Sequence, residues 1–239
     1  MIFDFDDSRT NRIVPFITSV LLAFISSFCV AKNNDFQIWT NSTALGSITQ
    51  VNPKLKYSFE YQGRFGDYAS RLSQLILRPG IGYQIIPSTS LWLGYAWIRT
   101  SQPFTIKPID ENRIWQQILW NKKFNAFTTT LRSRLEERFI QETLHTAWRY
   151  RQLFRISYAL PEHEQLTLIG SNEFFFHLNR YNLQNNIGFD QNRAFIGIGY
   201  QTSDKTTLEL GCLNQYIKRP KRSAYNGNYL FMNLIFNFG

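Results

Sequence analysis

Residues 54–65 read KLKYSFEYQGRF, and the alternation in this stretch decides the fold class. Apolar or aromatic residues occupy every second position, and polar or charged residues separate them. The apolar members are Leu55, Tyr57, Phe59 and Tyr61, and the polar members are Lys56, Ser58, Glu60 and Gln62. A period of two is typical of a β-strand with two unlike faces. We therefore predict a strand here.

The same period continues along the chain and predicts eleven strands. They are expected at about 36–48, 54–65, 71–84, 90–100, 112–121, 125–139, 146–160, 165–178, 191–201, 206–217 and 228–238. Bacterial outer-membrane barrels usually have an even number of strands. We therefore expect ten or twelve, with either one strand missed or the first segment not spanning.

Turn signals alternate with longer connections. Short turns are predicted at Pro87–Ser90, Asn121–Lys123, Pro161–Glu164 and Thr202–Lys205, and longer connections near 101–111, 140–146, 179–190 and 218–227. Outer-membrane barrels have this asymmetry, with tight periplasmic turns and longer outer loops. The predicted fold is all-β, an antiparallel up-and-down transmembrane β-barrel.

Composition supports lipid on the outside of this barrel. Aromatic residues make up 16% of the chain, yet the mean hydropathy is −0.28. A membrane barrel reconciles the two values, because half of its side chains face lipid and half face a polar interior. A soluble, lipocalin-like barrel would show the same alternation. The aromatic strand ends and the runs of about ten residues or more favour the membrane barrel.

The N-terminal segment predicts export. Arg9 and Arg12 precede an apolar run over 13–28, and the chain turns polar after Ala31. This run of 16 residues is shorter than the ~20 that a spanning helix needs. We expect residues 1–31 to be a cleaved signal peptide, and residues 32–239 to form the barrel domain in the bacterial outer membrane.

Two features of this segment leave alternatives open. Asp4, Asp6 and Asp7 make the first residues acidic, which suggests a start site farther downstream. Lipidation of Cys29 is the other alternative to simple cleavage, although Phe28 before it is bulky for such a site.

Charge and the last strand indicate the partners. The net charge is +9, and removal of residues 1–31, with two Arg and three Asp, raises it to +10. No basic tail or basic helix is present, so we expect no nucleic acid as a partner.

An apolar face runs to the end of the chain through Leu230, Met232, Leu234, Phe236 and Phe238. This face resembles the C-terminal strand that the barrel assembly machinery reads, except that Gly239 follows the final Phe. The expected partners are therefore this machinery and outer-membrane lipid.

The polar strand faces are rich in Arg and are assigned to the lumen. The predicted lumen residues are Arg64, Arg78, Arg132, Arg134, Arg138, Arg149, Arg151 and Arg155, with Glu60, Glu136, Glu173 and Glu209. One interpretation is an Arg–Glu lattice that fills a narrow barrel, and the other is a hydrated lumen that prefers anions. The excess of Arg requires water, bound anions, or acidic groups that fold inward, such as Asp67, Asp110, Glu111 or Asp190.

Catalytic patterns are weak. His177 shares a strand face with Ser171, but six residues of strand separate them by about 20 Å, so they cannot hydrogen-bond. His145 falls in a predicted outer loop and His163 in a predicted turn. The sequence has no metal-ligand spacing, phosphate loop or nucleotide fingerprint. We expect no catalytic, cofactor-binding or metal-binding residue, and no enzymatic activity.

Six short segments resemble a known family when taken in order. They are RFGD at 64–67, LRPGIGY at 77–83, WLGYAW at 92–97, RIWQQ at 113–117, RLEERF at 134–139 and DQNR at 190–193. Together they resemble domain-of-unknown-function family 2490, a set of exported bacterial proteins that look like outer-membrane barrels. The resemblance implies a fold and a location, and it transfers no catalytic residue.

The expected function is an integral outer-membrane β-barrel with a structural role or a role in small-solute, anion-preferring passage. Two alternatives remain open. One is a lipid or peptide hydrolase at the outer rim that uses His177 or His145. The other is a surface receptor or adhesin that binds through its outer loops.

Overall fold

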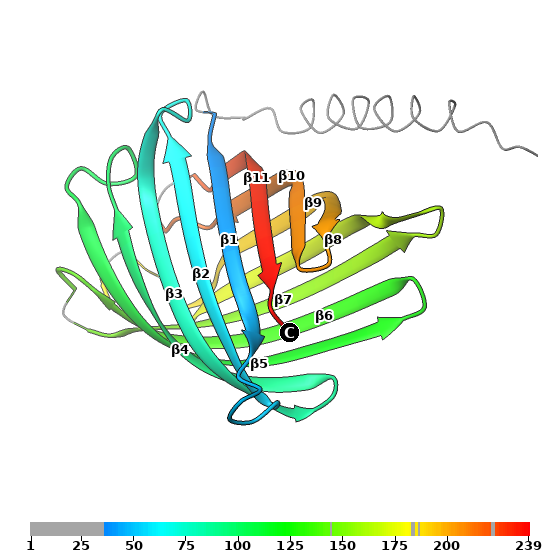
Figure 1. Ribbon diagram of the computed structural model, residues 1–239. Coiled ribbons are helices and arrows are strands. Elements are labelled where there is room, and N and C mark those ends of the chain that lie inside the picture. The colour runs from blue at the N-terminus through cyan, green and yellow to red at the C-terminus, as the bar shows by residue number, and fades with distance from the viewer. Residues whose placement is uncertain (1–35, 144, 183–184, 186, 221–222) are drawn as a thin grey trace, which may run out of the picture.

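The described part of the chain forms a closed β-barrel of eleven strands (Figure 1). This computed structural model describes residues 36–143, 145–182, 185, 187–220 and 223–239. The predicted signal peptide lies outside these residues. The strands are β1 (Ile38–Ser47), β2 (Leu55–Gly66), β3 (Arg71–Ile86), β4 (Thr89–Thr100), β5 (Ile109–Phe124), β6 (Phe127–Ile140), β7 (Ala147–Leu160), β8 (His163–His177), β9 (Gly188–Ser203), β10 (Thr206–Ile217) and β11 (Tyr225–Asn237).

The expectation of ten or twelve strands is wrong. Each strand is antiparallel to its neighbour in sequence, and β1 closes the barrel by pairing with β11 in parallel, from Ile38 opposite Leu230 to Leu45 opposite Asn237. An odd number of alternating strands leaves the first and last strands pointing the same way, so this seam must be parallel. The first segment is therefore a full member of the barrel, and the fold is only mostly antiparallel.

The connections at the two ends of the barrel differ in length. Two-residue turns join β3 to β4, β5 to β6, β7 to β8 and β9 to β10 at one end, where residues 48–54 also join β1 to β2. We call this the turn end, and the C-terminus lies there (Figure 1). The opposite end, the loop end, carries the connections 67–70, 101–108, 141–146, 178–187 and 218–224.

The predicted turn at Asn121–Lys123 is wrong, because β5 continues to Phe124. The chain reverses instead at Asn125, whose φ of 51° lies in the left-handed region that Asn tolerates in tight hairpins. Thr202 and Ser203 likewise belong to β9, and the turn that follows them is Asp204-Lys205.

The outer surface of the barrel is largely apolar. Ile81, Ile156 and Ile196 are 58%, 54% and 67% exposed, and each points away from the barrel interior. Aromatic residues on this face lie near both strand ends, as in the Phe127–Tyr158 pair toward the turn end and the Phe189–Tyr216 pair toward the loop end. Apolar side chains of this size are normally buried in a soluble protein.

Polar residues on the outer face pair with each other. Gln116 Nε2 donates to Glu137 Oε1 at 3.2 Å, and Ser133 Oγ donates to Gln152 Oε1 at 2.6 Å. Tyr150 also donates to Gln152 at 2.6 Å. These hydrogen bonds satisfy polar groups that the outer surface would otherwise present singly.

The apolar part of the interior is small and aromatic. Trp115 is 2% exposed and packs with Ile76, Ala96 and Ile98 on the inner wall of β3, β4 and β5. Across the barrel, Trp39 stacks on Tyr229 with ring centroids 4.3 Å apart. The described residues contain no helix long and apolar enough to cross a membrane.

Candidate functional site

The twelve predicted lumen residues all project into the barrel. The strand pleat places them there, together with buried residues of the same strand faces, such as Ile76 beside Arg78 on β3 and Phe175 beside Glu173 on β8. Further charged residues of the described chain also face the interior: Glu111 and Asp190, which were expected only as acidic groups that could fold inward, and Arg113 and Arg193, which were not predicted. Extending the alternation of Trp115 and Gln117 backward by two steps along β5 would have found Glu111 and Arg113. Asp67 stays exposed, and Asp110 pairs with Arg99 at 3.3 Å near the loop end.

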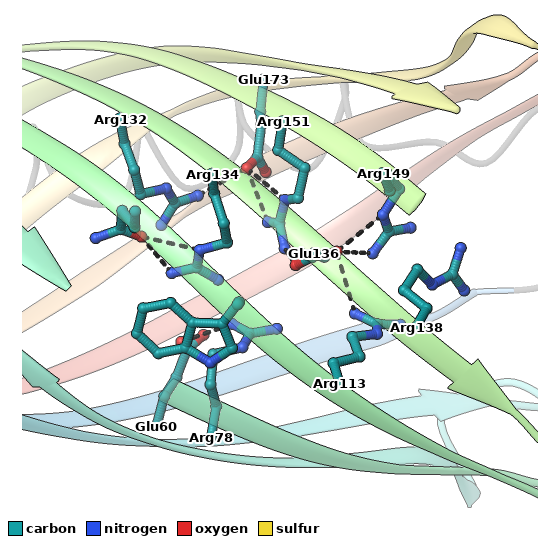
Figure 2. Close-up of polar contacts among 12 residues, drawn as sticks. Glu60, Arg78, Arg113, Arg132, Arg134, Glu136, Arg138, Arg149, Arg151 and Glu173 are labelled. Carbon is teal, nitrogen blue, oxygen red and sulfur yellow. Dashed lines mark hydrogen bonds and ion pairs between the residues drawn. The ribbon is translucent and has the colours of Figure 1, made fainter. Parts of the chain in front are cut away.

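Glu136 is the centre of an ion-pair network on the inner wall of β5 to β8 (Figure 2). Its side chain accepts hydrogen bonds from Arg149 at 2.6 Å and from Arg151 at 2.7 Å, and Arg113 lies 3.8 Å away. Glu136 itself is 0% exposed. Burying a carboxylate so completely is tolerable only because several guanidinium groups surround it.

Two further carboxylates extend the network in opposite directions. Toward the loop end, Glu111 bridges Arg113 and Arg138, with its Oε1 2.6 Å from Arg138 Nε. Toward the turn end, Glu173 bridges Arg151 at 2.8 Å and Arg132 at 2.7 Å. Five Arg and three Glu thus form one continuous chain of ion pairs.

Two separate ion pairs lie on other parts of the wall. Arg78 Nη1 donates to Glu60 Oε2 at 2.7 Å, between β3 and β2. Arg155 on β7 reaches Glu209 on β10 at 2.5 Å, and Asn233 donates to the same carboxylate at 2.9 Å. Because β7 and β10 are not neighbours in the barrel, the Arg155–Glu209 pair crosses the interior.

Three interior Arg residues form no ion pair within the described part of the chain, and each stacks on aromatic rings instead. Arg64 Cζ lies 3.9 Å from the centroid of Trp39, and Arg134 Cζ lies 4.5 Å from that of Trp115. Arg193 lies 4.7 Å from the ring of Phe175. Arg cations bind well to aromatic faces, so these rings replace part of the lost hydration.

The interior carries an excess of positive charge. Among the described interior residues, Arg113 and Arg193 bring the Arg residues to ten, and Glu111 and Asp190 bring the carboxylates to six, so Arg residues outnumber carboxylates by four. Lys56 on the inner face of β2 adds to this excess. Most of the charges are paired, as the lattice interpretation expects, and the remaining excess is positive.

A cavity of about 820 Å³ occupies the turn-end half of the barrel. Its mouth is lined by residues near the turns, including Ser88, Ser157 and Asn237. Its inner end is formed by Arg78, Trp115 and Arg134, the lining residues of β3, β5 and β6 that lie farthest from the turns. The network around Glu136 lies beyond that point, toward the loop end.

The loop end holds a smaller pocket of about 190 Å³ with a His–Asp pair. His177 Nε2 lies 3.3 Å from Asp190 Oδ1, and the ring of Tyr181 packs nearby. The described residues that line this pocket include no Ser, Thr or Cys. His145 lies exposed in the 141–146 connection, and His163 begins β8 at the turn end. Among the described lining residues, His177 thus has an acid partner but no Ser, Thr or Cys beside it.

Within the described residues, no cluster of three or more His, Cys, Asp or Glu side chains is arranged to hold a metal ion. Most of the buried polar side chains of the described interior carry guanidinium, carboxylate or amide groups.

Comparison with known proteins identifies the family. The chain is 31% identical over 206 residues to an uncharacterized protein of Methylorubrum extorquens, an alignment that covers 85% of this chain and 88% of that protein. No solved structure matches the chain. The profile of the family described as "Protein of unknown function (DUF2490)" matches residues 36–226, which begin just before β1 and end within β11. The chain therefore belongs to the DUF2490 family.

Proposed function

We propose that this protein is an integral outer-membrane β-barrel with a closed lumen, and that the turn-end cavity is a polar vestibule. The observation that carries the proposal is the inverted polarity of the barrel: Glu136 is 0% exposed inside, while Ile196 is 67% exposed outside. A soluble barrel would have the opposite arrangement, with its apolar side chains inside. In a bilayer the arrangement is favourable, because the apolar face meets hydrocarbon and the ions stay inside.

Strand length and closure support the same proposal. The strands have 10 to 16 residues, and a tilted strand needs about 9–11 to cross a bilayer. Closure satisfies the backbone hydrogen bonds between strands and leaves no sheet edge, which a lipid environment requires. The predicted signal peptide would deliver the chain for such insertion.

The interior supports a closed barrel over a permanently open pore. About eight strands leave an interior filled by side chains, and about sixteen leave an aqueous channel. Here the ion-pair network and the buried rings of Trp115 and Phe175 fill the space beyond the vestibule. We propose that the protein serves as a structural membrane barrel that admits small polar solutes from one side, and that any passage requires rearrangement of the network.

Cell fractionation combined with heat modifiability tests this proposal. We expect the mature chain, beginning at Lys32, in the outer-membrane fraction. In detergent electrophoresis the unboiled protein should migrate differently from the boiled protein, since a closed barrel resists unfolding by detergent. Recovery in a soluble fraction, with identical migration before and after boiling, would contradict it.

We further propose that the protein has no hydrolytic role. The pocket around His177 and Asp190 is the place where such a role would reside. The wild-type protein and the His177→Ala variant should show equal, background release from phospholipid and peptide substrates. A release that depends on His177 would favour the hydrolase alternative.

A further inference from the structure

The inner end of the turn-end cavity holds a guanidinium group that is fixed in place yet incompletely bonded. Arg134 is 4% exposed, stacks on Trp115, and donates from Nε and Nη2 to Gln117 Oε1 at 2.9 and 2.6 Å. Its Nη1 is buried and has no acceptor among the described residues. A buried N–H group without an acceptor is costly, so such a donor indicates that an acceptor binds there.

Two more Arg residues line the same cavity, and each is also held by a carboxylate while one of its N–H groups has no acceptor. Arg78 is tied through Nη1 to Glu60, and Arg132 through Nη2 to Glu173. The buried Nε atom of each has no acceptor within the described part of the chain. Arg78, Arg132 and Arg134 all line this cavity together with Glu60, and Figure 2 shows the four side chains in one region of the inner wall.

The excess of positive charge favours an anion as the acceptor. The nearby carboxylates of Glu60 and Glu173 already accept hydrogen bonds from Arg78, Arg132 and Arg151. Arg cannot lose its proton, so the interior can approach neutrality only by binding anions. Guanidinium forks match the oxygen geometry of carboxylate and phosphate groups, and stacking on Trp115 leaves Arg134 with little freedom to lose on binding.

We propose that the inner end of this cavity is a binding site for a small molecule that carries an oxyanion, a phosphate or a carboxylate, held by Arg78, Arg132 and Arg134. The volume of about 820 Å³ admits a molecule well beyond an inorganic ion, which would enter from the turn end. The site is formed within the barrel and does not depend on where the barrel resides, so it can be tested in detergent independently of membrane location.

Calorimetric titration of purified, heat-modifiable protein in detergent tests the site. The probes are inorganic phosphate, glucose 6-phosphate and succinate, with glucose as the neutral control, all at constant ionic strength. We expect saturable binding of at least one anionic probe and none of glucose. Stronger binding of glucose 6-phosphate or phosphate would identify a phosphate-bearing ligand, and stronger binding of succinate a carboxylate.

Two variants separate the site from a general charge effect. Arg134→Gln should weaken binding of the best probe by about tenfold or more, since it removes a charge-assisted hydrogen bond. Arg99→Gln removes the same charge from an exposed position near the loop end and should leave binding unchanged. As a measurement free of variants, the best probe should raise the unfolding temperature of the wild type. Absence of saturable binding by every probe, or equal binding by Arg134→Gln and the wild type, would overturn the proposal.

Discussion

The ring of Trp115 occupies the space that a side chain at position 94 would need. A Cβ at Gly94 would lie 2.2 Å from Trp115 Cζ2 and 2.5 Å from the carbonyl oxygen of Pro79. A Cβ at Gly80, on the adjacent strand, would also clash with the ring of Trp115. The two glycines therefore form the inner-wall recess that holds Trp115, and Trp115 in turn supports Arg134.

Replacing Gly94 should therefore destabilise the barrel and disturb the vestibule. We expect Gly94→Ala to lower the free energy of unfolding by about 1–3 kcal/mol, because the backbone oxygen of Pro79 cannot move aside easily. Chemical denaturation of the purified barrel measures this. Gly170→Ala is the matched control, since a Cβ there meets nothing within 4 Å, and its change should be much smaller. Equal stability of the two variants would show that Trp115 is placed elsewhere.

Removing the charge of Glu136, at the centre of the ion-pair network, should lower the free energy of unfolding substantially. Glu136→Gln leaves Arg149 and Arg151 without a carboxylate at this position, and breaking a buried pair in this way costs about 3–5 kcal/mol. The neighbouring residue supplies the control: Glu137 lies on the outer face beside Gln116. Glu137→Gln should change the free energy of unfolding by less than about 1 kcal/mol. A reversed order of the two effects would mean that the strand face is assigned wrongly.

The stability cost of an Arg introduced on the outer face should depend on how deep its position lies in the membrane. Ile196 lies near the middle of β9 and Tyr200 near its turn end, on the same outward face. In a bilayer, Ile196→Arg should cost about 2–4 kcal/mol and Tyr200→Arg about 0–1 kcal/mol. Unfolding from lipid vesicles measures both. In a soluble barrel neither change would be costly, so two near-zero values would argue against insertion.

Electrical recordings should show a nearly closed, anion-preferring barrel. The packed network predicts a conductance in planar bilayers far below that of sixteen-stranded porins. The excess of interior Arg predicts that reversal potentials across a salt gradient show anion preference. Replacing Arg132, Arg134 and Arg151 together by Gln should weaken or invert that preference. A large, cation-selective current through the wild type would contradict both the closed lumen and its charge.

Local alternation was enough to predict most strands and the inward direction of residues such as Arg134 and Glu136. It could not give the closure, because Ile38 and Leu230 are brought together only once all the intervening strands have paired. The preference for an even strand number therefore led to a wrong count. Ion pairs across the lumen could not be predicted either. Arg155 and Glu209 are 54 residues apart in the sequence, and they meet only because the sheet curves into a barrel.

The role of Trp115 could not be inferred from the sequence for a similar reason. Its recess depends on Gly80 and Gly94 lying opposite each other on β3 and β4, a matter of register between strands. A strand glycine by itself indicates only a bend or a close approach. The incompletely bonded donors of Arg78, Arg132 and Arg134 are also a property of the packed interior, since sequence spacing says nothing about which donors find acceptors.

Quenching of tryptophan fluorescence by brominated lipid tests the inverted barrel most directly. The six Trp residues divide evenly: Trp97, Trp120 and Trp148 share strand faces with exposed outer residues, while Trp39, Trp92 and Trp115 face inward. We predict strong quenching of the wild type in brominated vesicles. The Trp97→Phe, Trp120→Phe, Trp148→Phe triple variant, which keeps only the inner three, should be quenched far less. Equal fractional quenching of the two proteins, or no quenching of the wild type, would contradict a barrel with lipid outside and charge within.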